Sequence, residues 1–336
     1  MTAHGRNRGA TEVIALRSRP GITRVTMEIF LQQLVNGLVV GSVYALVALG
    51  YTMVYGILGL INFAHGDLVM VGAMTALQTM LFLMGAAPGM SPLAMLTLSL
   101  AVAIPVCMLL GYTMERLAYR RLRNAPRLAP LITAIGMSFL LQTIAMMLWG
   151  RNYHTFPQLV STVPLQPVAG VFVTPIQVTI VVGSALIMAA LIVLVTKTRL
   201  GRAMRATAEN HRVAALMGVD TNLIIALTFV IGAALAAVAG VMYASNYGIA
   251  HYGMGFMPGL KAFTAAVLGG IGNLGGAMLG GIVLGLVESF GAGYIEHMTF
   301  GLLNSSYQDI FAFIILGLVL IFRPTGLLGE RVSDRA

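Results

Sequence analysis

The sequence predicts an all-α membrane protein, a polytopic bundle of about eight to ten transmembrane helices with broken or re-entrant segments. Of its 336 residues, 58% are hydrophobic and only 9% are charged, whereas a soluble domain carries about 25% charged residues. Apolar windows of about 20 residues recur, the length that crosses a hydrocarbon core of about 30 Å. Short arginine-rich segments separate these windows, as is typical of cytoplasmic loops.

The chain divides into a basic extension at residues 1–28, a membrane domain at 29–323 and a tail at 324–336. Residues 1–26 carry five arginines against the single acidic residue Glu12, and they lack the apolar core of a signal peptide. Their charge places them in the cytoplasm. Because Met27 directly precedes the first apolar run, we expect the extension to be dispensable, and a later natural start site is the alternative.

The first half of the membrane domain alternates apolar runs with loops of opposite character. The run at 31–83 is too long for one crossing and is broken near INFAHGD at 61–67. The expected crossings and loops that follow are an external loop at 86–92, a crossing at 93–112, a cytoplasmic arginine loop at 116–127, a crossing at 131–149, an external loop at 150–170 and a crossing at 173–195.

The second half begins with a polar island at 198–220, which joins two apolar runs. The run at 223–245 leaves the cytoplasm, the run at 262–287 is interrupted by GGIGNLGG, and the run at 309–322 completes the membrane domain. Arginines in the tail keep the C-terminus inside. With both termini in the cytoplasm, the number of crossings is expected to be even.

Two segments combine membrane depth with helix breakers, 59–72 (GLINFAHGDLVMVG) and 269–281 (GGIGNLGGAMLGG). Irregular backbone at that depth is tolerated only where protein buries it or a cavity lines it, and such breaks point to the path of a transporter. Close helix packing at small-xxx-small spacing is the alternative. The candidate path residues are Asn62, His65, Gly66, Asp67, Gly269, Gly270, Gly272 and Asn273.

Asp67 has two interpretations. Its carboxylate meets the amino group of a zwitterionic substrate, or it caps a helix that starts at Leu68, and the cap is favoured. His65 is expected to be a hydrogen-bonded turn residue, since no second histidine or cysteine lies near it and no metal site is predicted. Lys261 and Glu288 are expected at the membrane interface, with Lys261 snorkelling toward water.

The island has the pattern of a docking helix. Good helix formers run from Gly201 to Met217, Gly218 suits the left-handed position after a helix end, and Asp220 or Thr221 can cap the next crossing. A solvated basic loop is the alternative, but charge alone requires no helix and no terminal glycine. The partner of such a helix lies on the same side of the membrane.

Several functions are excluded by missing motifs. The chain has no GxxxxGK[ST] loop for ATP and no HExxH or Ser-His-Asp pattern, so we predict no catalytic residues and no cofactor. The single Cys107 allows no internal disulfide and no zinc spacing. The formal net charge of +9 comes from arginines between crossings, so nucleic acid is not an expected partner.

Long motifs resemble the permeases of branched-chain amino acid ABC importers, H subunit, the LivH type. They are QQLVNGLVVGSVYALVALGYTMVYGILGLINFAHGD from Gln32, LITAIGMSFLLQ from Leu131, GRAMRATAENHRVAALMGVD from Gly201, LTFVIGAALAAVAGV from Leu227, GLKAFTAAVLGGIGNLGGAMLGG from Gly259 and RPTGLLG from Arg323. The likeness runs in order from about Gln32 to Gly329 and omits the N-terminal extension.

This resemblance implies a multi-pass protein of the bacterial inner membrane that imports leucine, isoleucine or valine. It implies four kinds of partner: a homologous M-type permease, two cytoplasmic ABC ATPase subunits, a periplasmic amino-acid-binding protein and membrane lipid. The implied ATPase-coupling residues are Arg205, Glu209, Ala214, Ala215 and Gly218. Two alternatives remain open, a related ABC permease for urea, amides or a sugar, and an ATP-independent channel or carrier.

Overall fold

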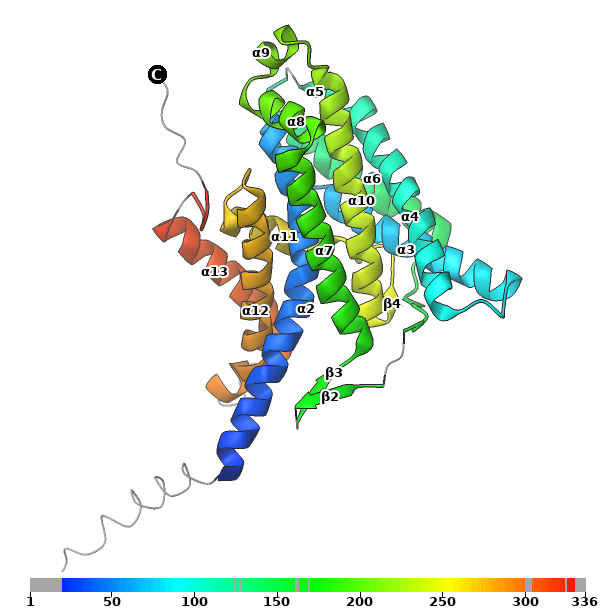
Figure 1. Ribbon diagram of the computed structural model, residues 1–336, viewed down its shortest axis with the longest axis vertical. Helices are drawn as coiled ribbons and strands as arrows, with labels where there is room; N and C mark the ends of the chain where they lie inside the picture. Colours follow the sequence, from blue (N-terminus) through cyan, green and yellow to red (C-terminus); the bar gives the residue numbers. More distant parts are fainter. Residues whose placement is uncertain are drawn as a thin grey trace, which may run out of the picture.

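The computed structural model describes residues 20–329 apart from 124, 127, 161–162, 169, 300–303 and 324. Predictions for the N-terminal extension and for the last residues of the tail therefore lie mostly outside the described residues. The helices are α2 (Pro20–Leu58), α3 (His65–Ala86), α4 (Pro92–Met114), η1 (Glu115–Tyr119), α5 (Arg120–Leu122), α6 (Leu128–Trp149), α7 (Pro175–Lys197), α8 (Arg199–Glu209), α9 (His211–Leu216), α10 (Thr221–Tyr247), α11 (Phe256–Gly269), α12 (Leu274–Met298), η2 (Ser305–Tyr307) and α13 (Gln308–Phe322). The predicted all-α membrane class is confirmed (Figure 1).

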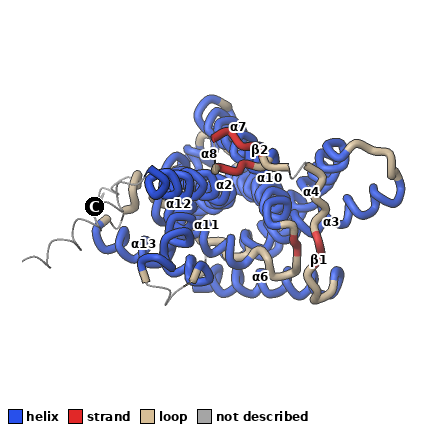
Figure 2. The backbone as a smooth tube through the Cα atoms, turned by 90° about the horizontal axis from the view of Figure 1, so that it is seen from below, coloured by secondary structure: helices blue, strands red, loops and turns tan. Residues whose placement is uncertain are grey.

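Seven helices in the described part of the chain are long and apolar enough to cross a membrane, and α11 and α13 are shorter apolar helices. Together these nine segments fall within the predicted range of eight to ten. Helices α2 and α10 are mostly buried in the protein, whereas α4, α6 and α7 are mostly exposed. Figure 2 shows the same division, with α4, α6, α7 and α13 around the periphery. Their exposed apolar faces suit contact with lipid.

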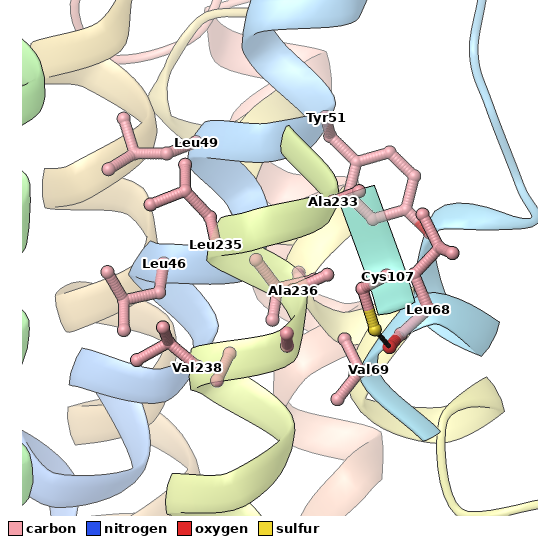
Figure 3. Packing of buried hydrophobic residues seen from close by; sticks show 14 of the residues in the cluster. Leu46, Leu49, Tyr51, Leu68, Val69, Cys107, Ala233, Leu235, Ala236 and Val238 are labelled. Carbon is pink, nitrogen blue, oxygen red and sulfur yellow. Dashed lines mark hydrogen bonds between the residues drawn. The ribbon is translucent and has the colours of Figure 1, made fainter. Parts of the chain in front are cut away.

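The core is built where small residues let helices touch. A Cβ atom on Gly285 of α12 would lie 2.3 Å from the Gly41 Cα of α2, and one on Gly72 of α3 would lie 2.5 Å from the Ala237 Cα of α10. Backbones approach this closely only at glycine and alanine. Leucine, valine and alanine side chains from α2, α3 and α10 fill the neighbouring space (Figure 3). The packing interpretation of these small residues is confirmed.

The start of α2 and the last described residues lie on opposite faces of the bundle, while the termini themselves lie outside the described residues. Near the start of α2, Gln32 donates from Nε2 to the Phe172 carbonyl and accepts from the Phe172 N–H, at 3.1 and 2.8 Å. Phe172 precedes α7, and the other end of α7 joins the island, so α2 begins on the face opposite the island (Figure 1). The last described residues lie on the island side, since the Leu327 N–H donates to the Leu268 carbonyl.

The order of the first helices gives the same arrangement. Both α2 and α3 cross the membrane, and the loop between Ala86 and Pro92 lies on the side opposite the island, where Leu96 borders the loop at 157–160. Two successive crossings return the chain to the face from which it started, so α2 begins on the face that carries this loop. The nine apolar segments among the described residues, an odd number, agree with a start of α2 and an end of α13 on opposite faces.

The face opposite the island carries short strands, and two of them, β1 and β2, lie within the loop predicted at 150–170. The strands are β1 (His154–Thr155), β2 (Leu165–Val168), β3 (Val171–Val173) and β4 (Ile249–Ala250). β1 pairs with β4 and β2 pairs with β3, both antiparallel. On the island side, the predicted arginine loop is partly folded, because Arg120 and Arg123 pair with the buried Glu115 at the end of α4. These pairings fix both ends of the bundle.

Candidate translocation site and coupling surface

Two helix N-termini meet inside the bundle. A Cβ atom on Gly66, in the first turn of α3, would lie 2.7 Å from the Gly255 carbonyl oxygen and 3.0 Å from the Gly259 Cα. Gly255 is the residue before α11, and Gly259 lies in its first turn. Each helix N-terminus carries a partial positive charge of about half an elementary charge. The junction therefore concentrates positive potential within an apolar bundle.

A cavity of about 450 Å³ opens beside this junction. Its polar lining comes from α2, α3 and α6, and consists of Tyr51, Asp67, Ser138 and Gln142. Its apolar lining consists of Phe63, Ile135, Phe139, Phe256 and Leu260. A mostly apolar wall with a few convergent polar groups, at this volume, is the usual character of a small-molecule site.

Asp67 lies in the cavity wall with 2% of its surface exposed. Helix α3 begins at His65 with Ala64 at the cap position and no side-chain cap, so the favoured prediction of an Asp67 cap is wrong. The Gln142 Nε2 donates to the Asp67 Oδ1 at 2.9 Å and to the Ser138 Oγ at 3.2 Å. No ion pair between described residues involves Asp67. The position in the first turn of α3 favours its negative charge.

The neighbouring candidates Asn62 and His65 do not line the cavity. The Tyr119 hydroxyl donates to the Asn62 Oδ1 at 2.7 Å, in a buried contact. The His65 ring is buried against Gly50 and lies edge-on to Tyr51, with centroids 4.9 Å apart. No group of three potential metal ligands occurs among the described residues. Of the predicted path residues in the first broken segment, only Gly66 and Asp67 line the cavity, together with the neighbouring Phe63.

The second broken segment lies near the island, away from this cavity. Gly269 ends α11, and Gly270, Gly272 and Asn273 lie in the turn between α11 and α12. The Asn273 side chain caps α12 by accepting from the Gly276 N–H at 3.0 Å, and its Nδ2 donates to the Leu328 carbonyl at 2.9 Å. Gly272 borders a surface hollow that Glu209 also lines. The two sets of predicted path residues are therefore not brought together.

An aromatic cluster separates the cavity from the island side. The Phe63 and Phe263 rings have centroids 5.6 Å apart, and the Tyr51 and Phe263 rings 6.2 Å apart. Tyr51 lines the large cavity and also a small void that reaches Tyr55 and Ile271. The aromatic cluster therefore lies between the cavity and this void.

A second buried charge centre was missed. Lys261 and Glu288 are 6% and 4% exposed, and their Nζ and Oε1 atoms lie 2.6 Å apart. Lys261 also pairs with Asp309 at 2.7 Å, and the Tyr44 hydroxyl donates to Glu288 at 3.0 Å. The predicted interfacial position is wrong, because each charge finds a partner on a neighbouring helix. Spacing of 27 residues hides such a pair from any local pattern.

The island folds as two helices rather than as the single predicted helix. Asn210 has extended backbone angles and accepts from the N–H groups of Arg212 and Val213, which ends α8 and caps α9. Gly218 has the predicted left-handed conformation, with φ at +84°. Asp220 caps α10 as predicted, accepting from Asn222 and Leu223 N–H groups. The short polar side chain of Asn210 competes for backbone bonds, which produces the break.

The predicted coupling residues occupy different environments. Glu209, Ala215 and Gly218 are exposed, whereas Ala214 is 3% exposed and packs inward. The Arg205 guanidinium donates to the Val195 carbonyl near the end of α7, so it fixes α8 against that helix.

The large apolar side chains of α9 and its C-terminal turn were missed as site residues. Val213, Leu216 and Met217 are 53%, 85% and 80% exposed. The sequence signal for these three residues is the presence of large apolar side chains inside a polar segment. Together they form an apolar ridge beyond the bundle, of the kind that marks a protein interface. We call Val213, Leu216 and Met217 the α9 ridge.

Known proteins share this sequence over most of its length. Residues 33–320 match the family model described as Branched-chain amino acid transport system / permease component. The chain is 49% identical over 306 residues to the high-affinity branched-chain amino acid transport system permease protein BraD of Pseudomonas aeruginosa, covering 90% of this chain and 96% of the relative. It is 44% identical over 309 residues to LivH of Escherichia coli, with the same coverages.

A more distant likeness, 35% identity over 133 residues, links 38% of the chain to an autoinducer 2 import system permease protein of Photorhabdus laumondii. No solved structure matches the chain. The family match and the two long alignments show that the chain belongs to the permease components of branched-chain amino acid transport systems.

Proposed function

We propose that this chain is the H-type membrane permease of an ABC importer that moves leucine, isoleucine or valine across the bacterial inner membrane. A homologous M-type permease completes the path, two cytoplasmic ATPase subunits supply the energy, and a periplasmic binding protein delivers the amino acid. The support is the long similarity to permeases named for branched-chain amino acid transport. ATP hydrolysis then resides on the partner subunits, and the chain itself catalyses no reaction.

The observation that carries the coupling role is the α9 ridge. Its side chains extend from a short helix that α8 and the Arg205–Val195 contact fix to the end of α7. A ridge attached in this way transmits a push or pull from a docked subunit directly into α7 and α10. The exposed Glu209, Ala215 and Gly218 border it, while Ala214 and Arg205 support it from the protein side.

The island face is assigned to the cytoplasm by its charge. Arg120, Arg121 and Arg123 lie on this face together with the island arginines, and Arg151 lies on the opposite face. Such an asymmetry follows the positive-inside rule. The start of α2 is then external. Single cysteines at Met27 and Leu216 test this in intact cells, because the native Cys107 is buried. A membrane-impermeant thiol reagent should label Met27→Cys and spare Leu216→Cys, and the reverse pattern would invert the topology.

We propose that the partner permease packs on the side of the bundle where the cavity is open. Phe139 and Phe256 line the cavity and are 64% and 56% exposed, so one wall is incomplete in the single chain. A second permease that packs against α6 and α11 would complete the wall and place the path between the two subunits.

The coupling proposal is tested by charging the ridge. Leu216→Glu should abolish copurification of the ATPase subunits and ATP-driven leucine uptake, while the permease pair stays in the membrane. Leu165→Glu is a matched control, since Leu165 is also exposed but lies in β2 on the opposite face. Normal copurification and uptake with Leu216→Glu would refute the docking role.

The alternative substrates and mechanisms are separated with the reconstituted complex. Uptake of labelled leucine that requires ATP supports the importer. Uptake of urea or a sugar in its place supports a related ABC permease, and leucine uptake without ATPase subunits supports a channel or carrier. The distant autoinducer 2 likeness covers too little of the chain to favour another solute.

A further inference from the structure

We propose that the cavity at the junction of α3 and α11 is a transit site for a zwitterionic α-amino acid, whose ammonium group binds Asp67, whose carboxylate faces the N-terminus of α11 and whose side chain lies against the aromatic wall. This rests on the proposed import function and adds the residues that hold the substrate during passage. The site has three parts, and each follows from a separate feature of the cavity.

The ammonium subsite is Asp67. Its side chain is buried in the cavity wall, and its Oδ1 accepts one hydrogen bond from the neutral amide of Gln142. A carboxylate buried in a membrane protein ordinarily has a cation or a water-filled cavity as its partner. Lys261, the cation of the buried Lys261–Glu288 pair, already forms ion pairs with Glu288 and Asp309. A primary ammonium ion from the cavity supplies the missing charge and can bond the carboxylate directly.

The carboxylate subsite is the N-terminus of α11. Asp67 already complements the positive end of α3, because it lies in the first turn of that helix. The first turn of α11 contains no acidic residue, and Gly255 provides no side-chain cap. Phe256 at the start of α11 lines the cavity that Asp67 also lines. Although the Phe256 N–H already donates to the Gly253 carbonyl and Pro258 has no N–H, the dipole of α11 still places positive potential beside the carboxylate of Asp67. This arrangement complements the ammonium and carboxylate groups of an amino acid.

The side-chain subsite is apolar and adaptable. Phe63, Phe139, Phe256 and Leu260 provide aromatic and aliphatic walls without a charged group among them. Transfer of a branched aliphatic side chain to such a wall is favourable by the hydrophobic effect. A hydrophilic or charged side chain would lose its water here without gaining a partner. The cavity thus suits leucine, isoleucine and valine as a group. It provides no feature that distinguishes one of these side chains from another.

The first experiment uses the whole complex in proteoliposomes with its binding protein. Asp67→Asn keeps the shape and the oxygen that accepts from Gln142 but removes the charge. Labelled leucine uptake should fall about 10- to 100-fold, while subunit assembly and ATP hydrolysis stimulated by the binding protein are retained. Asp67→Glu should restore most of the uptake. Unchanged uptake with Asp67→Asn would overturn the site while leaving the import function intact, whereas failure of the unmodified complex to import leucine would instead refute the proposed function.

The second experiment locates bound substrate even if Asp67→Asn fails to assemble. A diazirine analogue of leucine is photoactivated in the unmodified, energised complex, and the labelled peptides are identified by mass spectrometry. Labels are expected on α6 near Phe139 and on α11 near Phe256. An analogue that lacks the amino group should give no label there. Labels confined to the binding protein or to other helices, or equal labelling without the amino group, would overturn the proposal.

Discussion

The two broken segments of this chain look alike in sequence but lie at different depths and are held in different ways. The first break leads into α3, whose opening residues Gly66 and Asp67 lie beside the internal cavity. The second break lies near the island, where Asn273 caps α12 and bonds the Leu328 carbonyl. Glycine-rich interruption at membrane depth therefore does not by itself identify a path. What distinguishes the first break is a buried charge that faces open space.

The charges near the two breaks follow the same division. Lys261, on the helix that leads into the second break, is paired with acids on α12 and α13. Asp67, at the first break, accepts a hydrogen bond from the neutral amide of Gln142 and has no ion pair among the described residues. A paired buried charge holds helices together, whereas a buried charge without a counterion is available to a substrate. The predictions below test this difference.

The largest expected effect is the loss of the Lys261 charge. Lys261→Met leaves Glu288 buried without its cation, and removal of one partner of a buried pair costs about 3–5 kcal/mol. The thermal midpoint of the purified complex in detergent should fall sharply. Lys261→Met combined with Glu288→Gln should recover part of the loss, because the second change removes the unpaired charge. An unaltered thermal midpoint for Lys261→Met would show that the Lys261–Glu288 pair does not stabilise the helices around the second break.

A smaller effect is expected from crowding the helix after the second break. A Cβ atom on Gly280 would lie 2.0 Å from the Ala265 carbonyl oxygen, so Gly280→Ala should lower stability by about 1–3 kcal/mol. Gly275→Ala is the matched control, since a Cβ atom on Gly275 would lie 3.5 Å from its nearest neighbour, the Asn273 Oδ1. Both are measured as thermal midpoints of the complex. Equal midpoints for the two variants would contradict close packing at Gly280.

Composition and apolar length predict the helical membrane class and nearly every crossing, because hydrocarbon thickness sets the length of each run. The caps at Asp220 and Gly218 were also predictable, since their physical causes are local. The face on which α2 begins was not predicted, because the arginines that precede it in the sequence indicated the side of the island. The Lys261–Glu288 pair and the division of the island at Asn210 also escaped prediction.

The candidate site shows the same limit more clearly. Asp67 was identified from its chemistry alone, as a carboxylate within an apolar run. Its cavity depends on Ser138 and Gln142 from α6 and on Phe256 from α11, residues separated from Asp67 by 70 positions or more. No periodicity connects them, so only the packing of α3, α6 and α11 reveals that they face one space.

Loss of the α12 cap is expected to have a moderate effect. Asn273→Ala removes the acceptor of the Gly276 N–H and the donor to Leu328, and loss of an N-cap typically costs about 1 kcal/mol. Asn273→Asp keeps the cap acceptor but not the donor to Leu328, so it should recover most of the stability. Thermal midpoints of the complex measure both. A full loss with Asn273→Asp would assign the stabilisation to the tail contact instead of to the cap.

The smallest effect on stability is expected at Asp67, and it separates the two breaks most directly. Asp67→Asn retains an oxygen for the Gln142 bond and removes the cost of burying a charge that has no counterion. The thermal midpoint should therefore stay level or rise, by an amount equivalent to about 1 kcal/mol or less. The measurement is made without amino acid, beside Lys261→Met as the destabilised reference. If Asp67→Asn lowered the thermal midpoint as much as Lys261→Met, Asp67 would stabilise the fold in the same way as Lys261. The first break would then be no better supported as part of the substrate path than the second.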